Sequence, residues 1–574
     1  MALQVEQLIT DHLDLWTQAQ TAKSTSGRGS NNKIELTGIK KLRELILELA
    51  VRGKLVPQDP NDEPASELLK RIAAEKEALV KAKVIRKSKE LPPVATNEIP
   101  YDIPNGWILT RLGSIGDWGA GATPSRARSE YYGGDIPWFK SGELTADFID
   151  FSEEKITSLA LQDCSLRLNK IGDVLIAMYG ATIGKASILS VEGTTNQAVC
   201  ACTPFCGITN VYLLILLKAY KHRFISMGAG GAQPNISREK IIATPILLPP
   251  LNEQTRIVAK VDELMALCDQ LEQQSYQQLD AHNQLVDALL ATLTQSQNAD
   301  ELASNWQLLA AHFDTLFTTE YSIDALKQTI LQLAVMGKLV KQDPNDEPAS
   351  ELLKRIAAEK DALIKAGKIK NQKPLPPISE EEKPFELPEG WEWCRFNDFI
   401  SLISGQHLKP EEYLLQSENG TVPYITGPAE FGEQFPTYDK FTFEKRAVAS
   451  PGDVLITCKG AGLGKLNVAN CEIAISRQLM AVRAVLVDSQ YMTLMLNSMY
   501  DYFQSKGVGI AIPGISREDI LEKNCALPPI AEQKRIVLKV NELIELFDGL
   551  CKTLDNIRRT QAVLAEVLVE QVVA

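Results

Sequence analysis

The sequence has no apolar run long enough to cross a lipid bilayer. The longest one, Val211–Leu217, is far shorter than the about 20 apolar residues that a transmembrane helix needs. The N-terminal segment MALQVEQLITDHLDLW carries acidic residues within its apolar pattern and no cleavage site, which predicts an amphipathic helix and not a signal peptide. Ten cysteines in a long chain without a secretory leader favour reduced thiols. We therefore expect a cytoplasmic protein with no membrane partner.

Signatures of catalytic and metal-binding sites are also missing. The chain has 5 histidines, no H-E-x-x-H motif and no nucleophile elbow, so no hydrolytic site is predicted. The one cysteine cluster, Cys200, Cys202 and Cys206, lacks the paired C-x-x-C knuckles and the nearby histidine of structural zinc sites, and buried thiols are the better interpretation. The glycine-rich cofactor turn and the polar-Pro-Pro-aromatic tetrapeptide of a methyltransferase are absent. We expect a chain that is not an enzyme and binds neither cofactor nor metal.

Two glycine-rich turns, GATIGK at 180–185 and GAGLGK at 460–465, look like phosphate-binding loops but do not meet their requirements. Presentation of one lysine, Lys185 or Lys465, to a DNA phosphate is the better hypothesis. The first glycine of a P-loop and its magnesium-binding Ser or Thr are replaced by Tyr179 with Ala186 and by Lys459 with Leu466.

The chain also lacks an excess of positive charge, since its formal net charge is −13. This balance argues against a protein that coats nucleic acid or anionic membrane through its overall charge. A local basic surface can coexist with an acidic whole, so DNA binding by particular loops stays open.

What the sequence does have is an internal duplication. The segment QDPNDEPASELLKRIAAEK occupies residues 58–76 and returns unchanged at 342–360. Shorter echoes follow in the same order in both halves, and their order predicts a chain built twice from the same elements. They are IPNGW and LPEGW, two GDVLI segments, ISREKI and ISREDI, and LPPLNEQTRIV and LPPIAEQKRIV.

Helical and mixed stretches alternate along the chain. Each mixed stretch has short apolar runs broken by Gly, Pro and Asp, which is typical of an α+β domain. Ser66 is expected to cap the helix within the repeated segment. The expected boundaries are a helical region at 1–102, an α+β domain at 103–250, a long helix at 251–298, a second helical region at 299–386, a second α+β domain at 387–529 and a second long helix at 530–574.

Both long helices carry a heptad pattern, which predicts coiled-coil seams. The first seam runs from Ile257 to Leu289 through a polar middle and Leu285, and the second includes Ile557 and Leu564. At 1.5 Å per residue, the first helix would be on the order of 60 Å long.

The two halves differ most inside the α+β domains, where residues 107–247 and 391–526 agree only at framework points. Such a chain suits a protein that reads two unlike features at a fixed separation, because the helices set the distance and the domain surfaces set the identity. Arg pairs well with guanine, and Asn or Gln with adenine. The candidate DNA-binding residues are Thr123, Ser125, Arg126, Arg128, Lys140, Lys185, Gln233, Asn235 and Arg238 in the first half, and Gln406, His407, Lys409, Lys459, Lys465 and Arg517 in the second.

For any one of these residues, a phosphate contact or a solvated side chain is the simpler interpretation. Arg238 and Arg517 lie in the repeated S-R-E, where a structural cap or a framework phosphate contact suits them better than sequence reading. The aromatic residues Trp107, Trp138 and Trp391 are expected in the core.

With these residues in hand, the chain resembles the specificity subunit of type I restriction-modification enzymes. The resemblance covers almost the whole chain and implies two target recognition domains, each reading one half of a split DNA sequence. It further implies that long antiparallel coiled-coil helices separate the domains, with pseudo-twofold symmetry between the repeats. The segments that carry it are GATPSR at 121–126, YYGGDIPWFKSGEL at 131–144, QPNISRE at 233–239, the two GDVLI segments with their G-K turns and the two LPP-x-x-EQ-x-RIV junctions.

The resemblance also implies partners. These are double-stranded DNA, two methyltransferase (modification) subunits docked on the helices, and restriction subunits that translocate DNA. S-adenosylmethionine, ATP and Mg would then act in the partner subunits, and this chain would catalyse nothing. One departure is QHLKPEEY at 406–413, which replaces the G-x-T-P pattern of the first domain.

Two other functions stay open. An autonomous DNA methyltransferase would bind its own cofactor, so labelled cofactor would crosslink to the isolated chain. A structural adaptor that has lost DNA recognition would assemble partner helices but enrich no DNA motif.

Overall fold

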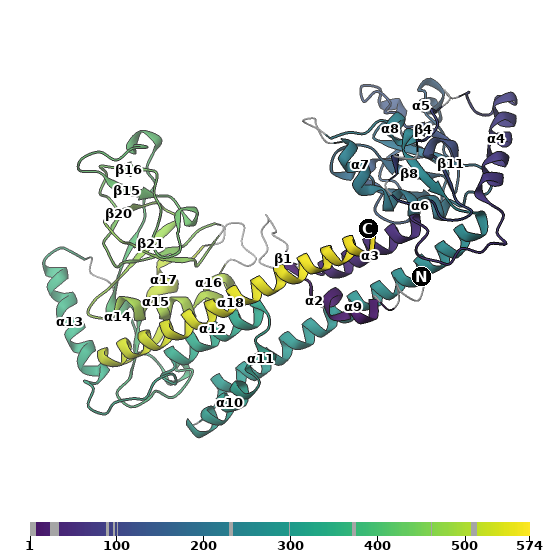
Figure 1. The fold of residues 1–574 in the computed structure, drawn as a ribbon. Helices are drawn as coiled ribbons and strands as arrows, with labels where there is room; N and C mark the ends of the chain where they lie inside the picture. The colour runs from purple at the N-terminus through teal and green to yellow at the C-terminus, as the bar shows by residue number, and fades with distance from the viewer. Residues whose placement is uncertain are drawn as a thin grey trace. The chain divides into compact units, whose positions relative to one another are not determined.

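The computed structural model describes residues 7, 9–22, 34–87, 91–95, 98–99, 101–228, 234–297, 299–369, 375–460, 462–506 and 514–573. The chain forms two compact units (Figure 1). The first unit comprises Met1–Ser24, Asn31–Gln277 and Arg558–Ala574, and the second comprises Thr25–Ser30 and Gln278–Ile557. Each unit contains one α+β domain and a set of helices, as the sequence predicted.

The first α+β domain is built on a five-stranded sheet of order β4-β11-β8-β9-β6. A second sheet has the order β10-β5-β7, and β3 pairs with β12. The strands are β3 (Ile108–Arg111), β4 (Gly116–Ala120), β5 (Tyr132–Phe139), β6 (Phe148–Ile149), β7 (Lys155–Ile156), β8 (Val174–Ala177), β9 (Ala186–Leu189), β10 (Thr194–Thr195), β11 (Val199–Pro204) and β12 (Pro245–Leu248), with a further pair β1 (Thr21–Ala22) and β2 (Ile34–Glu35) near the N-terminus.

The core of the first unit forms around α6, which packs against β8, β9 and α3 (Figure 1). This helix is apolar on every side, and Tyr212 and the five residues after it are all buried, as such a composition requires. The helices are α2 (Leu13–Gln18), α3 (Thr37–Val51), α4 (Ala65–Lys81), α5 (Ser158–Asp163), α6 (Asn210–Ala219), α7 (Lys221–Gly228), α8 (Arg238–Ala243), the first part of α9 (Leu251–Gln295) and the end of α18 (Ile530–Val573).

The second α+β domain has sheets of order β14-β21-β18-β19, β16-β15-β20-β17 and β13-β22. Here α15 takes the place of α6 and packs against α12, β19 and β21. The strands are β13 (Glu392–Arg395), β14 (Ile400–Ser404), β15 (Val422–Ile425), β16 (Phe441–Thr442), β17 (Val448–Ala449), β18 (Val454–Thr457), β19 (Leu466–Val468), β20 (Ile473–Ile475), β21 (Leu479–Ala484) and β22 (Asn524–Leu527). The helices are α10 (Ala299–Ala311), α11 (Phe313–Leu316), α12 (Glu320–Val335), α13 (Ala349–Lys365), α14 (Phe396–Phe399), α15 (Ser489–Ser498), α16 (Tyr500–Ser505) and α17 (Arg517–Leu521).

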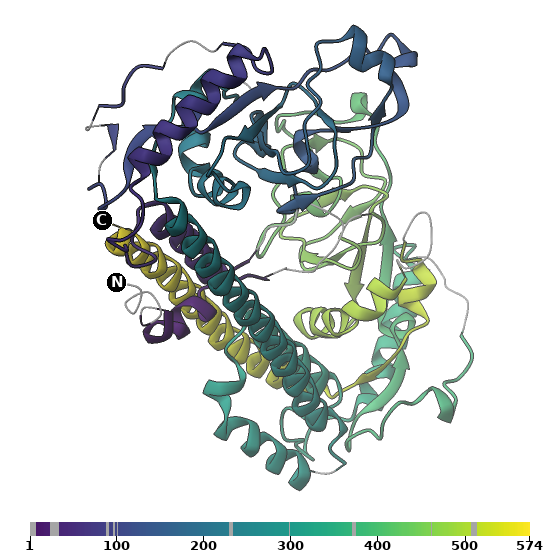
Figure 2. The same cartoon turned by 90° about the vertical axis from the view of Figure 1, so that its right-hand side faces the viewer.

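In the first unit, α3 contacts parts of both long helices (Figure 2). Arg43 Nη2 lies 2.6 Å from both Asp269 Oδ1 and Glu272 Oε2 of α9. Lys41 Nζ lies 3.4 Å from Glu566 Oε1 of α18. Since ion pairs this exposed contribute about 1 kcal/mol or less each, the apolar faces beneath them hold the helices together.

In the second unit, α12 makes the equivalent contacts. Its Lys327 Nζ lies 2.8 Å from Asp548 Oδ1 of α18, and its Tyr321 hydroxyl donates to Asp287 Oδ2 of α9 over 2.7 Å. The order of helices therefore repeats within the second unit, as the duplicated sequence predicted.

The predicted seams are wrong at three positions, Leu285, Ile557 and Leu564, although Leu289 at the end of the first seam is half-buried against the core. Leu285 is 52% exposed and Leu564 also 52%, whereas their neighbours Val286 and Ala565 are buried. Ile557 is 48% exposed as well. A strict heptad drifts by about 20° per repeat around a straight α-helix, so after four heptads the buried face has moved to the next residue.

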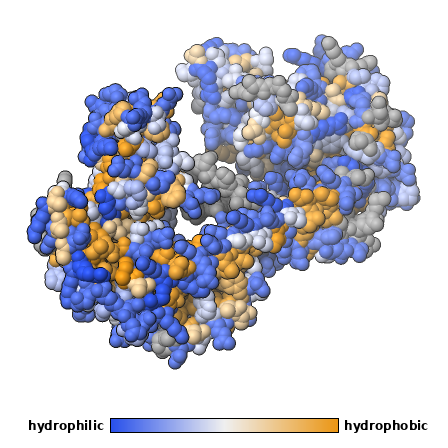
Figure 3. Space-filling view, turned by 60° about the vertical axis from the view of Figure 1, so that its left-hand side comes forward, coloured by the Kyte–Doolittle hydropathy of each residue, from blue (hydrophilic) through white to orange (hydrophobic). Residues whose placement is uncertain are grey.

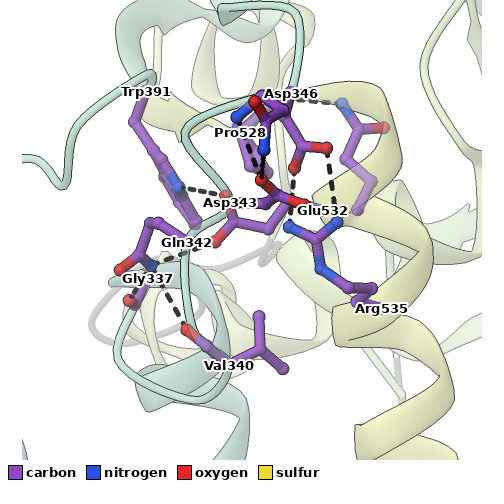
Figure 4. A network of polar contacts seen from close by, with 11 residues as sticks. Gly337, Val340, Gln342, Asp343, Asp346, Trp391, Pro528, Glu532 and Arg535 are labelled. Atoms are coloured by element: carbon purple, nitrogen blue, oxygen red, sulfur yellow. Dashed lines mark hydrogen bonds and ion pairs between the residues drawn. The ribbon is translucent and has the colours of Figure 1, made fainter.

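The repeated segment of the second unit fixes the start of α18 (Figure 4). The Gln342 amide donates to Gly337 O over 2.8 Å and to Glu532 Oε1 over 3.1 Å. The indole of Trp391 donates to Glu532 Oε2 over 3.0 Å. Glu532 is thus held between the repeated segment and the domain, and its burial raises the pKa of its carboxyl group.

The same network occurs in the first unit. Gln58 donates to Gly53 O over 2.7 Å and to Glu253 Oε1 over 3.2 Å, and burial again raises the pKa of the Glu253 carboxyl. Arg256 Nη2 of α9 lies 2.6 Å from Asp62 Oδ2. The identity of the two segments is explained by this shared structural role.

Ser66 does not cap the helix of the repeated segment. The helix α4 begins one residue earlier, at Ala65, after Pro64 with a φ of −57°. The Ala65 amide donates instead to Gly106 O over 2.8 Å, and Ala349 donates to Gly390 O over the same distance. The sequence could not show this, because the acceptor lies on the domain that follows.

Candidate nucleic-acid interface

Several loops of the second α+β domain meet at one edge of its sheets, where β14 and β18 end and β21 begins. We call this the loop edge of that domain, made of residues 405–409, 426–428, 458–460, 462–465 and 476–478. Backbone hydrogen bonds join the loops: Gly405 N to Leu479 O over 3.0 Å, Cys458 N to Gln478 O over 2.7 Å and Ser476 N to Ile425 O over 3.0 Å.

The loop edge carries several exposed cations, and Glu412 is the carboxylate that acts on one of them, Lys409. Lys409, Lys459, Lys465 and Arg477 are exposed. Within the part of the chain that the structure describes, their side-chain nitrogen atoms make no ion pair or hydrogen bond. On a chain of net charge −13, such a cluster creates a local positive potential of the kind that attracts phosphates.

Two neutral candidates lie on the same edge. Gln406 and His407 are exposed, and the Gln406 backbone amide donates to Ile475 O over 2.9 Å. The sheet topology therefore places the loops of five predicted residues of the second half at one edge of the domain: Gln406, His407, Lys409, Lys459 and Lys465.

The first α+β domain has an equivalent loop edge, made of residues 121–128, 139–140, 178–185 and 196–198. Gly121 N donates to Val199 O over 2.9 Å and Met178 N to Ala198 O over 2.8 Å. A Cβ on Gly121 would lie 2.3 Å from Asn196 O, so glycine lets these loops approach closely. Thr123, Ser125 and Arg126 follow that glycine and are exposed.

Two cations of this first loop edge, Arg126 and Lys140, are paired with the same carboxylate, unlike the lysines of the second. Arg126 Nη1 lies 2.7 Å from Glu154 Oε2, and Lys140 Nζ lies 2.5 Å from Glu154 Oε1. The two hydrogen bonds lower the pKa of Glu154 to about 2. The Arg126 guanidinium also stacks on Tyr132 and Trp138, with its carbon 4.4 Å and 5.2 Å from the ring centroids.

Arg128 lies apart from this pair. Its Nε is 2.8 Å from Glu130 Oε1, and its guanidinium covers the Tyr131 ring at 4.3 Å. Thr123 donates its hydroxyl to the Gln197 side chain. Asn235 is exposed and forms a β-bridge with Tyr179, while Gln233 lies outside the described residues.

The two G-K turns have a structural role in their domains, in addition to the DNA contact predicted for their lysines. Gly184 and Gly464 have φ angles of +78° and +76°, which favour glycine. A Cβ there would lie 2.8 Å from Lys221 Cγ in the first domain and 2.9 Å from Phe503 Cβ in the second. Lys185, which follows the first of these glycines, is half-buried, whereas Lys465 is exposed.

Arg238 and Arg517 bind backbone carbonyls, which supports the framework role predicted for them. Arg517 Nη1 donates to Leu402 O over 3.1 Å and Arg238 Nη1 to Trp118 O over 3.4 Å. Each arginine is the first residue of its short helix, after a capping serine. Both therefore tie a helix to the neighbouring strand.

Sequence reasoning missed Gln197 and Arg477, which occupy equivalent turns before β11 and β21. Both side chains are exposed at the loop edge of their domain. No glycine marks these turns, so the search for polar residues beside glycine passed over them. The signal was a pair of similar strand ends, TTNQAVC at 194–200 and AISRQLM at 474–480, that differ in the middle.

The cysteines are free, and Cys200 and Cys202 are buried as predicted, whereas the prediction of a buried thiol is wrong for Cys206, which is exposed. Burial raises the pKa of the Cys200 thiol to about 12.

Among the described residues no three His, Cys, Asp or Glu side chains come together as a metal-binding group. The described helices include none with the length and apolar character needed to cross a membrane.

The chain is similar to known proteins in sequence and in structure. The family described as "Type I restriction modification DNA specificity domain" matches residues 104–281 and 388–557. The EcoAI specificity subunit of a type I restriction enzyme from Escherichia coli is 43% identical, over 99% of each chain. The EcoEI specificity subunit, also from Escherichia coli, is 41% identical over 99% of each chain.

One similar chain comes from a solved structure described as the structural basis of complex assembly and conformational transition of the type I R-M system. Its sequence is 20% identical to that of this protein. It matches 83% of this chain and 99% of its own length, with a TM-score of 0.48. The family match covers more than half of the residues, and the two Escherichia coli relatives are similar from end to end. The chain therefore belongs to the family of type I restriction-modification DNA specificity subunits, whose role is DNA recognition without catalysis.

Proposed function

We propose that the two α+β domains, residues 103–250 and 387–529, are target recognition domains that each contact one half of a bipartite double-stranded DNA target through their loop edges. The observation that carries this proposal is the contrast between shared framework and unlike loops. Arg238 and Arg517 make the same framework contact. In contrast, Glu154 pairs with Arg126 and Lys140 at the first loop edge, whereas Lys409, Lys459, Lys465 and Arg477 at the second form no ion pair among the described residues.

The phosphates of DNA would act as counter-charges for the unpaired lysines of the second loop edge. Phosphates would contact Lys409, Lys459 and Lys465, which fixes the position of the duplex but carries no sequence information. The polar residues beside them, Gln406 and His407, are placed to contact base edges. At the first loop edge, Thr123, Ser125, Lys185 and Asn235 would contact DNA directly, and Arg126 and Lys140 after release from Glu154.

The long helices at 251–298 and 530–574 would set the distance between the two half-targets. We infer that they pair antiparallel in a coiled coil, with pseudo-twofold symmetry between the repeats. The burial of Val286 and Ala565 supports a seam that follows the 3.6-residue period of a straight helix.

The helices would also dock two methyltransferase subunits, one on each repeat. Hydrophobic patches interrupt a largely hydrophilic surface (Figure 3), and the exposed large apolar residues of the second unit include Leu538, Leu546 and Ile557 of α18. At 100° per residue these three fall within about 100° of arc on one helix face. A hollow of about 430 Å³, lined by residues of the repeated segment that include Asp343 and Asp346, lies on the same unit.

Restriction subunits would complete the assembly in the cytoplasm. S-adenosylmethionine, ATP and Mg would then act in the partner subunits, and this chain would bind no cofactor of its own.

Selection from a random-sequence DNA pool tests this function. The complete complex, with methyltransferase and restriction subunits, is incubated with the pool, and bound DNA is sequenced. We expect a motif of two short specified segments separated by an unspecified spacer of fixed length. Enrichment of no motif would support the structural adaptor instead, and a single continuous motif would contradict the two-domain mechanism.

A further inference from the structure

We propose that the turn before the last long strand of each recognition domain determines specificity, with Arg477 contacting a guanine and Gln197 contacting an adenine in the two halves of the target. This inference rests on the proposed function and names the bases that two particular side chains contact.

The turn that carries Arg477 is fixed at both ends, although its side chain is exposed. Ser476 Oγ donates to Thr426 O over 2.5 Å and accepts from Gln478 N over 3.2 Å. Cys458 N donates to Gln478 O over 2.7 Å. Because the residues on both sides of Arg477 are held by hydrogen bonds, its side chain starts from a defined position, as readout of a base edge requires.

Arg477 differs from every other arginine of its domain. The five arginines of residues 387–529 all lie in the described part of the chain, and four of them are bound to carboxylates or carbonyls. Arg477 makes no such contact within the described residues. The bound four are Arg395 with Glu382, Arg446 with Glu412 and Glu444, Arg483 with Asp453, and Arg517 with Leu402 O.

The neighbours of Arg477 also favour a DNA contact. Lys459 directly follows Cys458, whose amide binds the turn, and Gln406 N donates to Ile475 O just before it. Lysines can hold the phosphate backbone on either side while the planar guanidinium donates to both O6 and N7 of one guanine.

The first domain has the same turn with a different central residue. Asn196 Oδ1 accepts from Ala198 N over 3.1 Å, as Ser476 Oγ does from Gln478 N, and Met178 N donates to Ala198 O over 2.8 Å. Gln197 stands where Arg477 stands, and its side-chain oxygen accepts from the Thr123 hydroxyl. Among the described residues, that hydrogen bond uses one lone pair of the amide oxygen, so the second lone pair and the amide N–H groups of Gln197 can still pair with a base.

An amide side chain pairs in a bidentate manner with N6 and N7 of adenine, and an arginine with guanine. One framework with two unlike residues at its centre therefore gives two unlike half-targets. This relation also explains why the turn is not conserved between the repeats while the strands around it are similar.

The test uses the complete complex with its partner subunits, comparing wild type with the R477Q, R477A and Q197R variants by sequencing of DNA selected from a random pool. We expect the wild type to specify guanine at one position of one half-target. In R477Q this preference falls by about 5- to 150-fold in favour of adenine, and in R477A it falls without a replacement. Q197R shifts one position of the other half-target towards guanine.

The matched control is R446Q, which removes an arginine that is already paired with Glu412 and Glu444 and should leave the motif unchanged. A motif identical to wild type in R477Q would overturn the inference. So would a loss of affinity that is equal for all sequences, since that result marks a phosphate contact. The wild-type arm separates the two proposals, because a wild type without a bipartite motif would refute the proposed function itself.

Discussion

Arg535 Nη2 of α18 lies 2.6 Å from Asp346 Oδ2 of the repeated segment, and the Asp346 side chain is only 10% exposed. The pair ties the first turns of the long helix to the segment that precedes the second recognition domain. Arg256 and Asp62 make the same contact at the same distance in the first unit.

Replacement of Asp346 by Asn should therefore destabilise the second unit. The variant replaces a charge-assisted hydrogen bond with a neutral one and removes the nearest counter-charge of Arg535, which costs about 1–3 kcal/mol. Urea unfolding of the D346N variant should show this loss. The matched control is E347Q, which breaks an exposed pair with Arg355 and should change the free energy of unfolding by about 0.5 kcal/mol or less. Equal losses in the two variants would contradict the structural role of the Asp346 pair.

The buried carboxyls Glu253 and Glu532 should make stability depend on pH. Burial raises the pKa of each above its ordinary value of 4.5, so the folded chain binds more protons than the unfolded chain just above that value. Their contribution to stability is then fully present below pH 4.5 and is lost as pH rises through the raised values. Thermal melting from about pH 5 to about pH 7 should show this fall, and the E253Q/E532Q double variant should flatten it. An unchanged slope would show that the two groups ionise alike in both states.

Glu154 should restrain DNA binding by the first recognition domain. The E154Q variant frees Arg126 and Lys140 to contact phosphates, so the affinity of the complete complex for non-specific DNA should rise. The slope of log K against log salt should steepen by about 2. Glu153 is exposed and forms no ion pair among the described side chains, so E153Q removes the same charge without freeing a cation. Equal effects of the two variants would mean that only net charge matters.

The Glu154 carboxyl should not act as a pH switch near neutral pH. Hydrogen bonds lower its pKa to about 2, so its stabilising pair is lost only as pH falls through that value. The ratio of E154Q to wild-type affinity should therefore stay constant from about pH 5 to about pH 8. A ratio that changes within this range would contradict the geometry of the pair.

The exposed apolar face of α18 should be needed for assembly. Leu538 is 71% exposed and Leu546 58%, so L538E/L546E should leave the chain folded and weaken its association with the methyltransferase subunit at least tenfold. Gel filtration of the mixed subunits measures this, with L415E as control because Leu415 is 73% exposed on the second recognition domain. Normal assembly of L538E/L546E would place the docking surface elsewhere.

The sequence predicted the scaffold better than the interface. Repetition and helical periodicity can be read from the sequence alone, so the long helices and the repeated order of elements could be predicted. The predicted heptad positions are wrong at Leu285 and Leu564, because a pattern that repeats every 3.5 residues diverges from a helix of 3.6 residues per turn over this length. The pairing of Arg126 with Glu154 and the exposure of Arg477 depend on which strands become neighbours, which no local pattern shows.

Exchange of residues 107–247 for the corresponding domain of another family member tests the central claim most directly. Methylated adenines are mapped across the genome of a host that carries the chimera with its partner subunits, and the motif is compared with that of the wild type. We predict that one half of the bipartite motif changes while the other half and the spacer length stay the same. A change in both halves, or in neither, would contradict the account of two independent recognition domains on one scaffold.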